Sequence, residues 1–333
     1  MSLRNAALPL FAFAATALAA CMQSAPVSVG AQAADTGYHV YDGAPHEGPY
    51  VSAHRGGAAY APEDTLAAYQ NAARLGVDDF ETDTSLTSDG VLVLIHDGTV
   101  NRTSNCTGNV SAFTLEDLRK CDAGYWYVPG QGTTSGTHND TQSHPYRGKG
   151  VVFPTAQEVF DLAKSLGPLG PTVTIELKDY DCRAAAPALV DLIHASGIQH
   201  RIIVQSFEPY CLDLVKLGDS TIATLHLSNE GCTAPLAYNI ARGHNYVSPT
   251  WVSQADGGDV NAECADAVHA AGQKLVPWTV DTIADLQFAT DIGSDGIITN
   301  YPACMMQMQG RPMPASVTPP DIAFPEPLAA CKG

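Results

Sequence analysis

Short apolar segments alternate with amphipathic ones along most of the chain. Apolar runs of about five residues predict eight strands, at 50–53, 77–83, 172–178, 202–206, 221–227, 246–248, 274–280 and 296–299. Apolar residues spaced as on one side of a helix predict helices between them, at 62–75, 157–166, 184–196, 210–217, 235–242, 261–271 and 283–290. The run 91–95 follows a hairpin-type Ser-Asp-Gly turn and extends the second unit. This order predicts an α/β fold, a (β/α)8 TIM barrel over residues 50–305.

A doubly wound sheet is the other fold built on this alternation. It is disfavoured because no Gly-rich phosphate-binding fingerprint follows the first strand. Residues 102–150 interrupt the alternation, and only 114–119 look like a capped helical turn. We therefore predict an insertion over the barrel mouth, after the strands of the second unit, and a role for it in substrate selection.

The insertion carries aromatic residues and two histidines. Tyr125, Trp126 and Tyr127 are expected to pack within the insertion, the alternative being contact with an acyl chain. His138 and His144 are expected to be solvated loop residues and not metal ligands.

Both ends of the chain lie outside the predicted barrel. Residues 1–20 start with a positive charge, continue with an apolar run too short to span a membrane, and lead to Leu-Ala-Ala-Cys at 18–21. This pattern is typical of a bacterial lipoprotein signal peptide, with a lipid anchor on Cys21; a plain secretory signal is the alternative. Residues 21–49 are predicted to be a flexible tether, and 306–333 a Pro-rich tail across the barrel exterior. We expect export to the periplasm or to the outer membrane.

Eight cysteines remain after Cys21, and an even number in an exported chain predicts up to four disulfides. Eight cysteines allow 105 pairings, so sequence alone does not fix them. We expect sequential neighbours to pair, Cys106 with Cys121 first, and Cys304 with Cys331 to hold the tail. The spacings do not fit a metal site.

Chemically active residues gather where the predicted strands end, the edge at which TIM barrels place their active sites. Alternation along strands directs Glu81 and Asp83 to one side, and Glu176 and Lys178 likewise. Three carboxylates favour one hard divalent cation, Ca²⁺ or Mg²⁺, over zinc. A cation and Arg55 would neutralise a phosphate, and two histidines would move protons. An ordinary ion pair between Glu176 and Lys178 is the alternative for those two residues.

The formal net charge of −18 argues against a nucleic-acid partner. It does not argue against a small anionic substrate, because charges beyond a Debye length of roughly 10 Å are screened. A local cluster of cations therefore decides what binds.

Several motifs resemble one family in order and spacing: HRGG at 54–57, PEDT at 62–65, ETD at 81–83, HDGTVNRTSN at 96–105, ELK at 176–178, QSFEP at 205–209, PWTVD at 277–281 and GSDGIITNYP at 293–302. Over residues 50–305 the chain resembles the bacterial glycerophosphodiester phosphodiesterases. The resemblance implies metal-dependent hydrolysis of small glycerophosphodiesters to glycerol 3-phosphate and an alcohol. It also implies the site residues: Glu81, Asp83 and Glu176 for the metal, His54 and His96 as general acid and base, Arg55 and Lys178 for the phosphate, and Phe207 and Trp278 as the wall around the alcohol.

Two positions depart from the pattern of that family. Asp64 stands where Asn is usual, at an expected helix start, and Asn300 stands where Asp is common, at a strand end. Glu63 is expected either to approach the metal or to start the helix. Lysophospholipase-D-like activity on lipid headgroups, or a surface-binding lipoprotein that uses the barrel as a scaffold, are the alternative functions. The nucleophile, water or the glycerol hydroxyl, and the oligomeric state stay open.

Overall fold

Eight parallel strands form a nearly closed barrel in the computed structural model, which describes residues 47–332. The strands follow the order β8-β7-β6-β5-β4-β2-β1-β9. Their bounds are β1 (Tyr50–Ala53), β2 (Asp79–Leu86), β4 (Thr172–Leu177), β5 (Ile202–Ser206), β6 (Ala223–Ser228), β7 (Tyr246–Pro249), β8 (Lys274–Leu275) and β9 (Gly296–Thr299). Between β8 and β9, the amide of Asp295 donates to Leu275 O at 2.8 Å, and the amide of Ile298 donates to Pro277 O at 3.1 Å. The predicted TIM barrel is confirmed.

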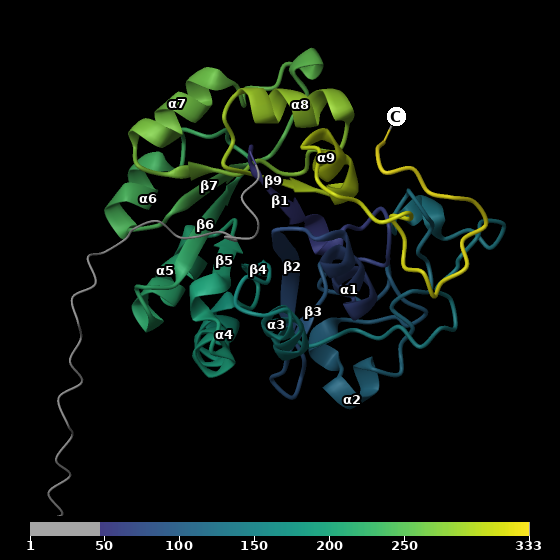
Figure 1. Cartoon of the computed structure of the whole chain (residues 1–333). Coiled ribbons are helices and arrows are strands. Elements are labelled where there is room, and N and C mark those ends of the chain that lie inside the picture. Colours follow the sequence, from purple (N-terminus) through teal and green to yellow (C-terminus); the bar gives the residue numbers. More distant parts are fainter. Residues whose placement is uncertain (1–46, 333) are drawn as a thin grey trace, which may run out of the picture. The chain divides into compact units, whose positions relative to one another are not determined.

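Helices surround the strands (Figure 1). They are α1 (Leu66–Leu75), α3 (Ala156–Ser165), α4 (Cys182–Ser196), α5 (Pro209–Gly218), α6 (Leu236–Arg242), α7 (Ala262–Ala270), α8 (Ile283–Asp291) and α9 (Pro302–Met308). The apolar side chains of the strands pack against these helices. For example, Val173 of β4, Val204 of β5 and Leu189 of α4 are fully buried in one hydrophobic cluster. None of the helices within residues 47–332 is long and apolar enough to cross a membrane.

Some predicted bounds were wrong. The first helix begins at Leu66 and not at residue 62, because the Thr65 hydroxyl accepts from the amide of Ala68 at 3.3 Å and caps it there. Asp64 has a φ of +54°, which no helix start adopts. The helix α9 was missed, since 302–308 lies where the predicted tail begins. Its residues Cys304, Met305 and Met306 are buried against the barrel.

The insertion follows a β-hairpin. The strand β3 (Leu92–Leu94) pairs antiparallel with β2, as the run 91–95 predicted. Three short elements follow: η2 (Val110–Ala112), α2 (Leu115–Leu118) and η3 (Ser135–Thr137). Hydrogen bonds tie the insertion to the barrel mouth, from the Tyr127 hydroxyl to Ala59 O at 2.7 Å and from the Tyr301 hydroxyl to Gly130 O at 2.7 Å.

The aromatic residues of the insertion face one another. The ring of Trp126 stacks on His138 with centroids 4.4 Å apart, and Tyr127 meets Tyr146 edge-on at 5.3 Å. His144 lies between the backbone oxygens of Tyr127 and Asn139 at 3.1 Å each. Packing within the insertion is therefore confirmed. His138 is exposed, as expected, while His144 is half-buried.

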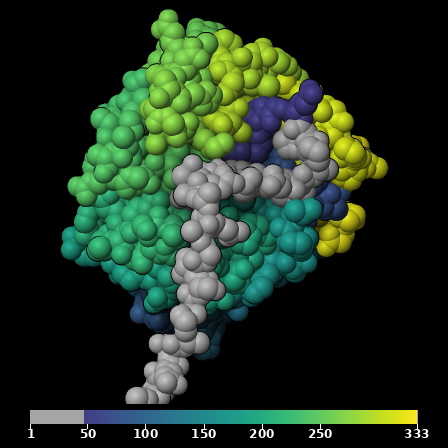
Figure 2. Space-filling model, turned by 60° about the vertical axis from the view of Figure 1, so that its left-hand side comes forward, coloured from purple at the N-terminus to yellow at the C-terminus, as the bar shows by residue number. Residues whose placement is uncertain are grey.

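Four disulfides join sequential neighbours, as expected: Cys106–Cys121, Cys182–Cys211, Cys232–Cys264 and Cys304–Cys331. The last one holds the tail against α9. In the space-filling view the purple start of the described chain lies against the yellow C-terminal part, where Gln309 Nε2 donates to Pro49 O at 2.7 Å (Figure 2). The predicted signal peptide, Cys21 and most of the tether lie outside the described residues.

Candidate active site

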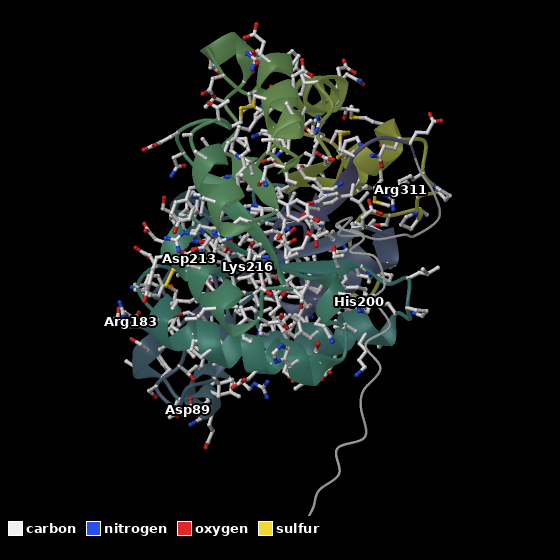
Figure 3. All side chains as sticks on the ribbon, turned by 90° about the vertical axis from the view of Figure 1, so that its left-hand side faces the viewer. Asp89, Arg183, His200, Asp213, Lys216 and Arg311 are labelled. Atoms are coloured by element: carbon white, nitrogen blue, oxygen red, sulfur yellow. A yellow bond between two sulfur atoms is a disulfide. The ribbon has the colours of Figure 1, made fainter. Side chains whose placement is uncertain are left out.

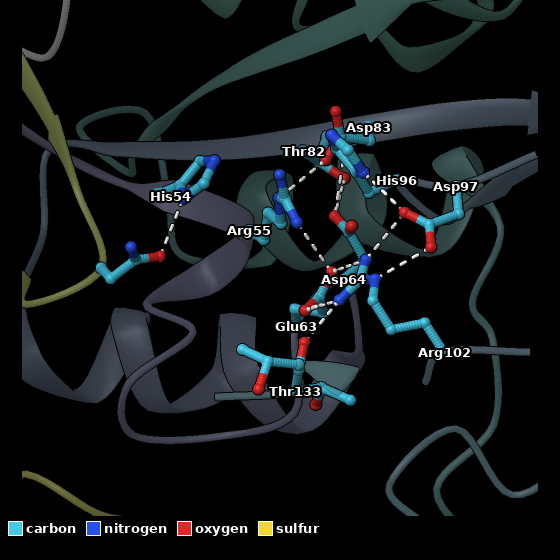
Figure 4. Close-up of polar contacts among 12 residues, drawn as sticks. His54, Arg55, Glu63, Asp64, Thr82, Asp83, His96, Asp97, Arg102 and Thr133 are labelled. Atoms are coloured by element: carbon cyan, nitrogen blue, oxygen red, sulfur yellow. Dashed lines mark hydrogen bonds and ion pairs between the residues drawn. The ribbon is translucent and has the colours of Figure 1, made fainter. Parts of the chain in front are cut away.

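The predicted site residues meet at the carboxyl ends of the strands. Eight of the nine line one cavity of about 50 Å³: His54, Arg55, Glu81, Asp83, His96, Glu176, Phe207 and Trp278. The ninth, Lys178, bonds to Asp83 and Glu176 from the side. Part of this cluster is shown in Figure 4.

Strand register places the three carboxylates together. In the pairing of β2 with β4, Asp83 lies directly opposite Glu176. Glu81 is two residues before Asp83 on β2, and side chains two apart on a strand share a side. Directly after β1 the backbone of Arg55 takes a φ of +51°, and its amide donates to Glu81 Oε2 at 2.8 Å. Short strand ends thus fix the positions of these side chains.

The carboxylates carry more negative charge than a buried site tolerates without cations. Burial, and then the neighbouring Asp83, raise the pKa of Glu81 well above its usual range and that of Glu176 to about 8. Burial by itself would raise the pKa of Asp83, but Lys178 and Arg55 hold it well below its usual range. Lys178 Nζ lies 2.6 Å from Asp83 Oδ1 and 2.8 Å from Glu176 Oε2.

Within residues 47–332, no three His, Cys, Asp or Glu side chains form a ready-made coordination shell. At this site Lys178 Nζ forms ion pairs with both Asp83 and Glu176. The donor set nevertheless fits a hard divalent cation. All three side chains offer carboxylate oxygens, and the buried Asp83 Oδ2 makes no hydrogen bond, although Arg55 Nε lies 3.2 Å from it. Glu81, Asp83 and Glu176 are the residues that would hold such an ion.

The two histidines have different partners. His54 Nδ1 lies 2.7 Å from Asn300 Oδ1, and Asn300 Nδ2 donates to Asp281 Oδ2 at 2.8 Å. Because the amide nitrogen is committed to Asp281, its oxygen must accept, which puts the proton on Nδ1 of His54 and leaves Nε2 unprotonated. Burial, and then Arg55, lower the pKa of His54 to about 3. His54 is thus neutral at ordinary pH, with a free lone pair.

His96 contacts a carboxylate. Its Nδ1 lies 2.7 Å from Asp97 Oδ1, and Arg102 in turn binds both oxygens of Asp97 at 2.8 and 2.9 Å. The two imidazoles thus have unlike partners, an amide oxygen for His54 and a carboxylate for His96.

Glu63, Arg102 and Asp97 form an ion-pair network beside the site that sequence reasoning missed. Glu63 does not start α1, which begins at Leu66, and it lines the neighbouring cavity of about 470 Å³ and not that of the carboxylates. It pairs with Arg55 at 2.9 Å and with Arg102 at 2.7 Å, and although burial opposes it, these arginines lower its pKa to about 2. The motif 96–105 contained Asp97 and Arg102, but spacing gave no signal for the pairing with Glu63.

Asp64 supports the site from behind. Its Oδ1 accepts from the hydroxyls of Tyr69 at 2.9 Å and Thr82 at 3.0 Å and from the amide of Asp83 at 3.3 Å. Burial, and then Asp83, raise its pKa to about 8. An Asn in this position would accept the same bonds, which explains how the two residue types can exchange here.

Aromatic side chains close one side of the cavity. The rings of Phe207 and Trp278 meet edge-on with centroids 5.3 Å apart. Trp278 Nε1 donates to Ser248 O at 3.1 Å, which fixes the indole. Both are half-buried, so they present apolar surface to whatever enters.

Comparisons with known proteins agree with this geometry. The model of the Glycerophosphoryl diester phosphodiesterase family matches residues 54–304. A glycerophosphodiester phosphodiesterase of Caldanaerobacter subterraneus subsp. tengcongensis is 32% identical over 262 residues, covering 78% of this chain and 96% of the relative. One of Bacillus subtilis is 28% identical over 273 residues, covering 75% and 83%.

Solved structures show the same fold. A putative glycerophosphoryl diester phosphodiesterase from Silicibacter pomeroyi aligns with a TM-score of 0.68 at 22% identity, covering 82% of this chain and 97% of the other. An Oleispira antarctica phosphodiesterase, solved with the product sn-glycerol-3-phosphate, aligns with a TM-score of 0.65 at 23% identity, covering 79% and 96%. Members of the matched family generally bind a divalent metal ion. The chain belongs to the glycerophosphoryl diester phosphodiesterase family and is a phosphoric diester hydrolase.

Proposed function

We propose that this protein hydrolyses glycerophosphodiesters to glycerol 3-phosphate and an alcohol, with one divalent cation, Ca²⁺ or Mg²⁺, at Glu81, Asp83 and Glu176. The observation that carries the proposal is the pair of imidazoles with unlike partners beside three buried carboxylates. Family membership, and the product sn-glycerol-3-phosphate in the Oleispira structure, support the substrate class.

The residues divide the chemistry among them. His54 takes a proton at Nε2 from the nucleophile, water or the glycerol hydroxyl of the substrate, as its oxygen bonds to phosphorus. His96 gives a proton to the oxygen of the leaving alcohol as the bond between that oxygen and phosphorus breaks. Arg55, and Lys178 once it turns from the carboxylates, offset charge on the phosphoryl oxygens. A bound cation supplies further neutralisation of the same oxygens. Phe207 and Trp278 enclose the carbon atoms of the alcohol that lie next to the phosphate.

The experiment is a glycerol 3-phosphate release assay on purified protein with glycerophosphoethanolamine. We expect release that EDTA abolishes and that Ca²⁺ or Mg²⁺ restores. Absence of release with both cations would refute the activity, and release indifferent to EDTA would refute the metal dependence.

We also propose that the protein is exported and held at a membrane by a lipid on Cys21. The signal pattern at 1–21 supports this, and four disulfides suit an oxidising compartment. Fractionation of cells that express the wild type or Cys21→Ala is the test. The wild type is expected in the membrane fraction and the variant outside it; equal distribution of both would contradict the anchor.

A further inference from the structure

The tail leads from one end of the barrel to the other. At the amino ends of the strands Arg311 binds the buried Asp78 at 2.7 Å (Arg311 is labelled in Figure 3). The chain then follows α1, where Asn71 Nδ2 donates to Val317 O at 2.8 Å. Beyond it, Phe324 meets Tyr146 of the insertion with ring centroids 6.1 Å apart.

The last part of this path reaches the barrel mouth. The hydroxyl of Tyr60 donates to Ala330 O, and Cys331 is bonded to Cys304. Directly after this disulfide, the backbone of Lys332 pairs with that of Thr282 as in a parallel bridge. These three contacts therefore hold Ala330, Cys331 and Lys332 in place.

As a result, Lys332 lines a second cavity that shares its wall with the catalytic centre. This cavity has a volume of about 470 Å³, and His54, Arg55, Arg102, Asn300 and Lys332 are among its lining residues. It is large enough for the variable headgroup of a diester, whereas the 50 Å³ cavity holds only a few atoms. Arg102 connects the two regions, because it lines the larger cavity and binds Asp97, the partner of His96.

The charged side chains that line this cavity differ in how far neighbouring groups of opposite charge neutralise them. Arg55 and Arg102 each pair with two carboxylates, Glu63 being common to both. Asp281 also lines the cavity, and its carboxylate accepts from the amide and the side chain of Asn300 at 2.9 and 2.8 Å. Lys332 is exposed, and within residues 47–332 its ammonium group has no hydrogen bond or ion pair.

We propose that Lys332 binds a carboxylate on the headgroup of the substrate, so that the enzyme favours glycerophosphodiesters whose leaving alcohol carries that group. An ammonium group and a carboxylate attract each other and form charge-assisted hydrogen bonds. The inference rests on the proposed phosphodiesterase function and adds to it a substrate class and a specificity-determining residue.

Two substrates that differ by one carboxylate provide the test. Glycerophosphoserine and glycerophosphoethanolamine are the same molecule apart from that group. The readout is the ratio of kcat/KM for the serine to the ethanolamine diester. In the Lys332→Met variant we expect this ratio to fall about fivefold, the size of an exposed ion pair, through KM and not kcat.

Two further variants isolate the charge. Lys332→Arg keeps the cation and should keep the wild-type ratio. Lys149→Met removes an exposed lysine that lines a different cavity, between α1, the insertion and the tail, and should also leave the ratio unchanged. The unfolding temperatures of all variants show whether the fold is intact.

Each outcome decides something. A fall of the ratio in Lys332→Met alone supports the inference. Hydrolysis of both diesters with an unchanged ratio in Lys332→Met overturns the inference and leaves the phosphodiesterase function standing. Hydrolysis of neither diester by the wild type overturns the function, and the inference with it.

Discussion

The bottom and the entrance of the active site are built in different ways. The bottom consists of Glu81, Asp83 and Glu176, buried side chains on two strands paired in continuous register, and of the buried Lys178 directly after β4. The entrance is lined by insertion residues and by Lys332, which lie outside the eight barrel strands and are held in place by hydrogen bonds, one β-bridge and a disulfide. We propose that the strands hold the groups that act on the phosphate and that the separate segments select the alcohol. Changes at the bottom should therefore abolish turnover, and changes at the entrance should alter selectivity.

The largest effect is expected at the histidines. His54→Ala or His96→Ala should lower kcat at least about a hundredfold, because each removes one proton-transfer step. His200→Ala is the control, since His200 is exposed on η4 (Gln199–Arg201), and the residue is labelled in Figure 3. Steady-state kinetics measures all three, and near-normal kcat in either site variant would refute its role.

A smaller effect is expected at the aromatic wall. Trp278→Ala removes much of the apolar surface that encloses the substrate, and KM should rise about tenfold. Trp278→Phe keeps an aromatic ring against Phe207 and should recover most of the affinity. An unchanged KM in Trp278→Ala would show that the substrate does not touch this wall.

The smallest effect is expected at the entrance. Replacing Cys304 and Cys331 by Ala frees the tail, and the serine-to-ethanolamine ratio should fall about fivefold, as for the loss of Lys332. The matched control replaces Cys182 and Cys211, whose separation of 29 residues is close to the 27 of the first pair. Both double variants should unfold at lower temperature, since each loses a cross-link. If the control also changed the ratio, the effect would reflect stability and not the position of Lys332.

Sequence alone predicted the bottom of the site because two simple rules place it. Side chains two apart on a strand share a side, and TIM barrels gather such strand ends at one edge. The entrance follows no such rule. Arg102 meets Glu63 from 39 positions away, and Lys332 is held at the mouth by the Cys304–Cys331 disulfide together with backbone contacts to Tyr60 and Thr282. Loop conformations such as the positive φ of Asp64, which moved the start of α1, likewise depend on tertiary contacts.

The carboxylates themselves predict how stability responds to pH and to cations. The pKa of Glu176 rises from its ordinary 4.5 to about 8 on folding, and that of Glu81 also rises. At these carboxylates the folded protein keeps protons that the unfolded chain releases, so without a cation stability should fall as pH rises toward 8. Below about pH 6.5 His54 opposes this fall, because it is neutral in the folded protein and protonated in the unfolded chain. A divalent cation that binds the ionised carboxylates of the folded state only should reverse this loss.

The unfolding temperature of the metal-free protein between pH 5 and 8, with and without Ca²⁺ or Mg²⁺, measures this directly. We expect the temperature to fall toward pH 8 without cation and to rise on addition of one cation, more at pH 8 than at pH 5. The rise should be much smaller in Glu81→Gln. No rise with both ions, or an equal rise in Glu81→Gln, would contradict a cation site formed by Glu81, Asp83 and Glu176.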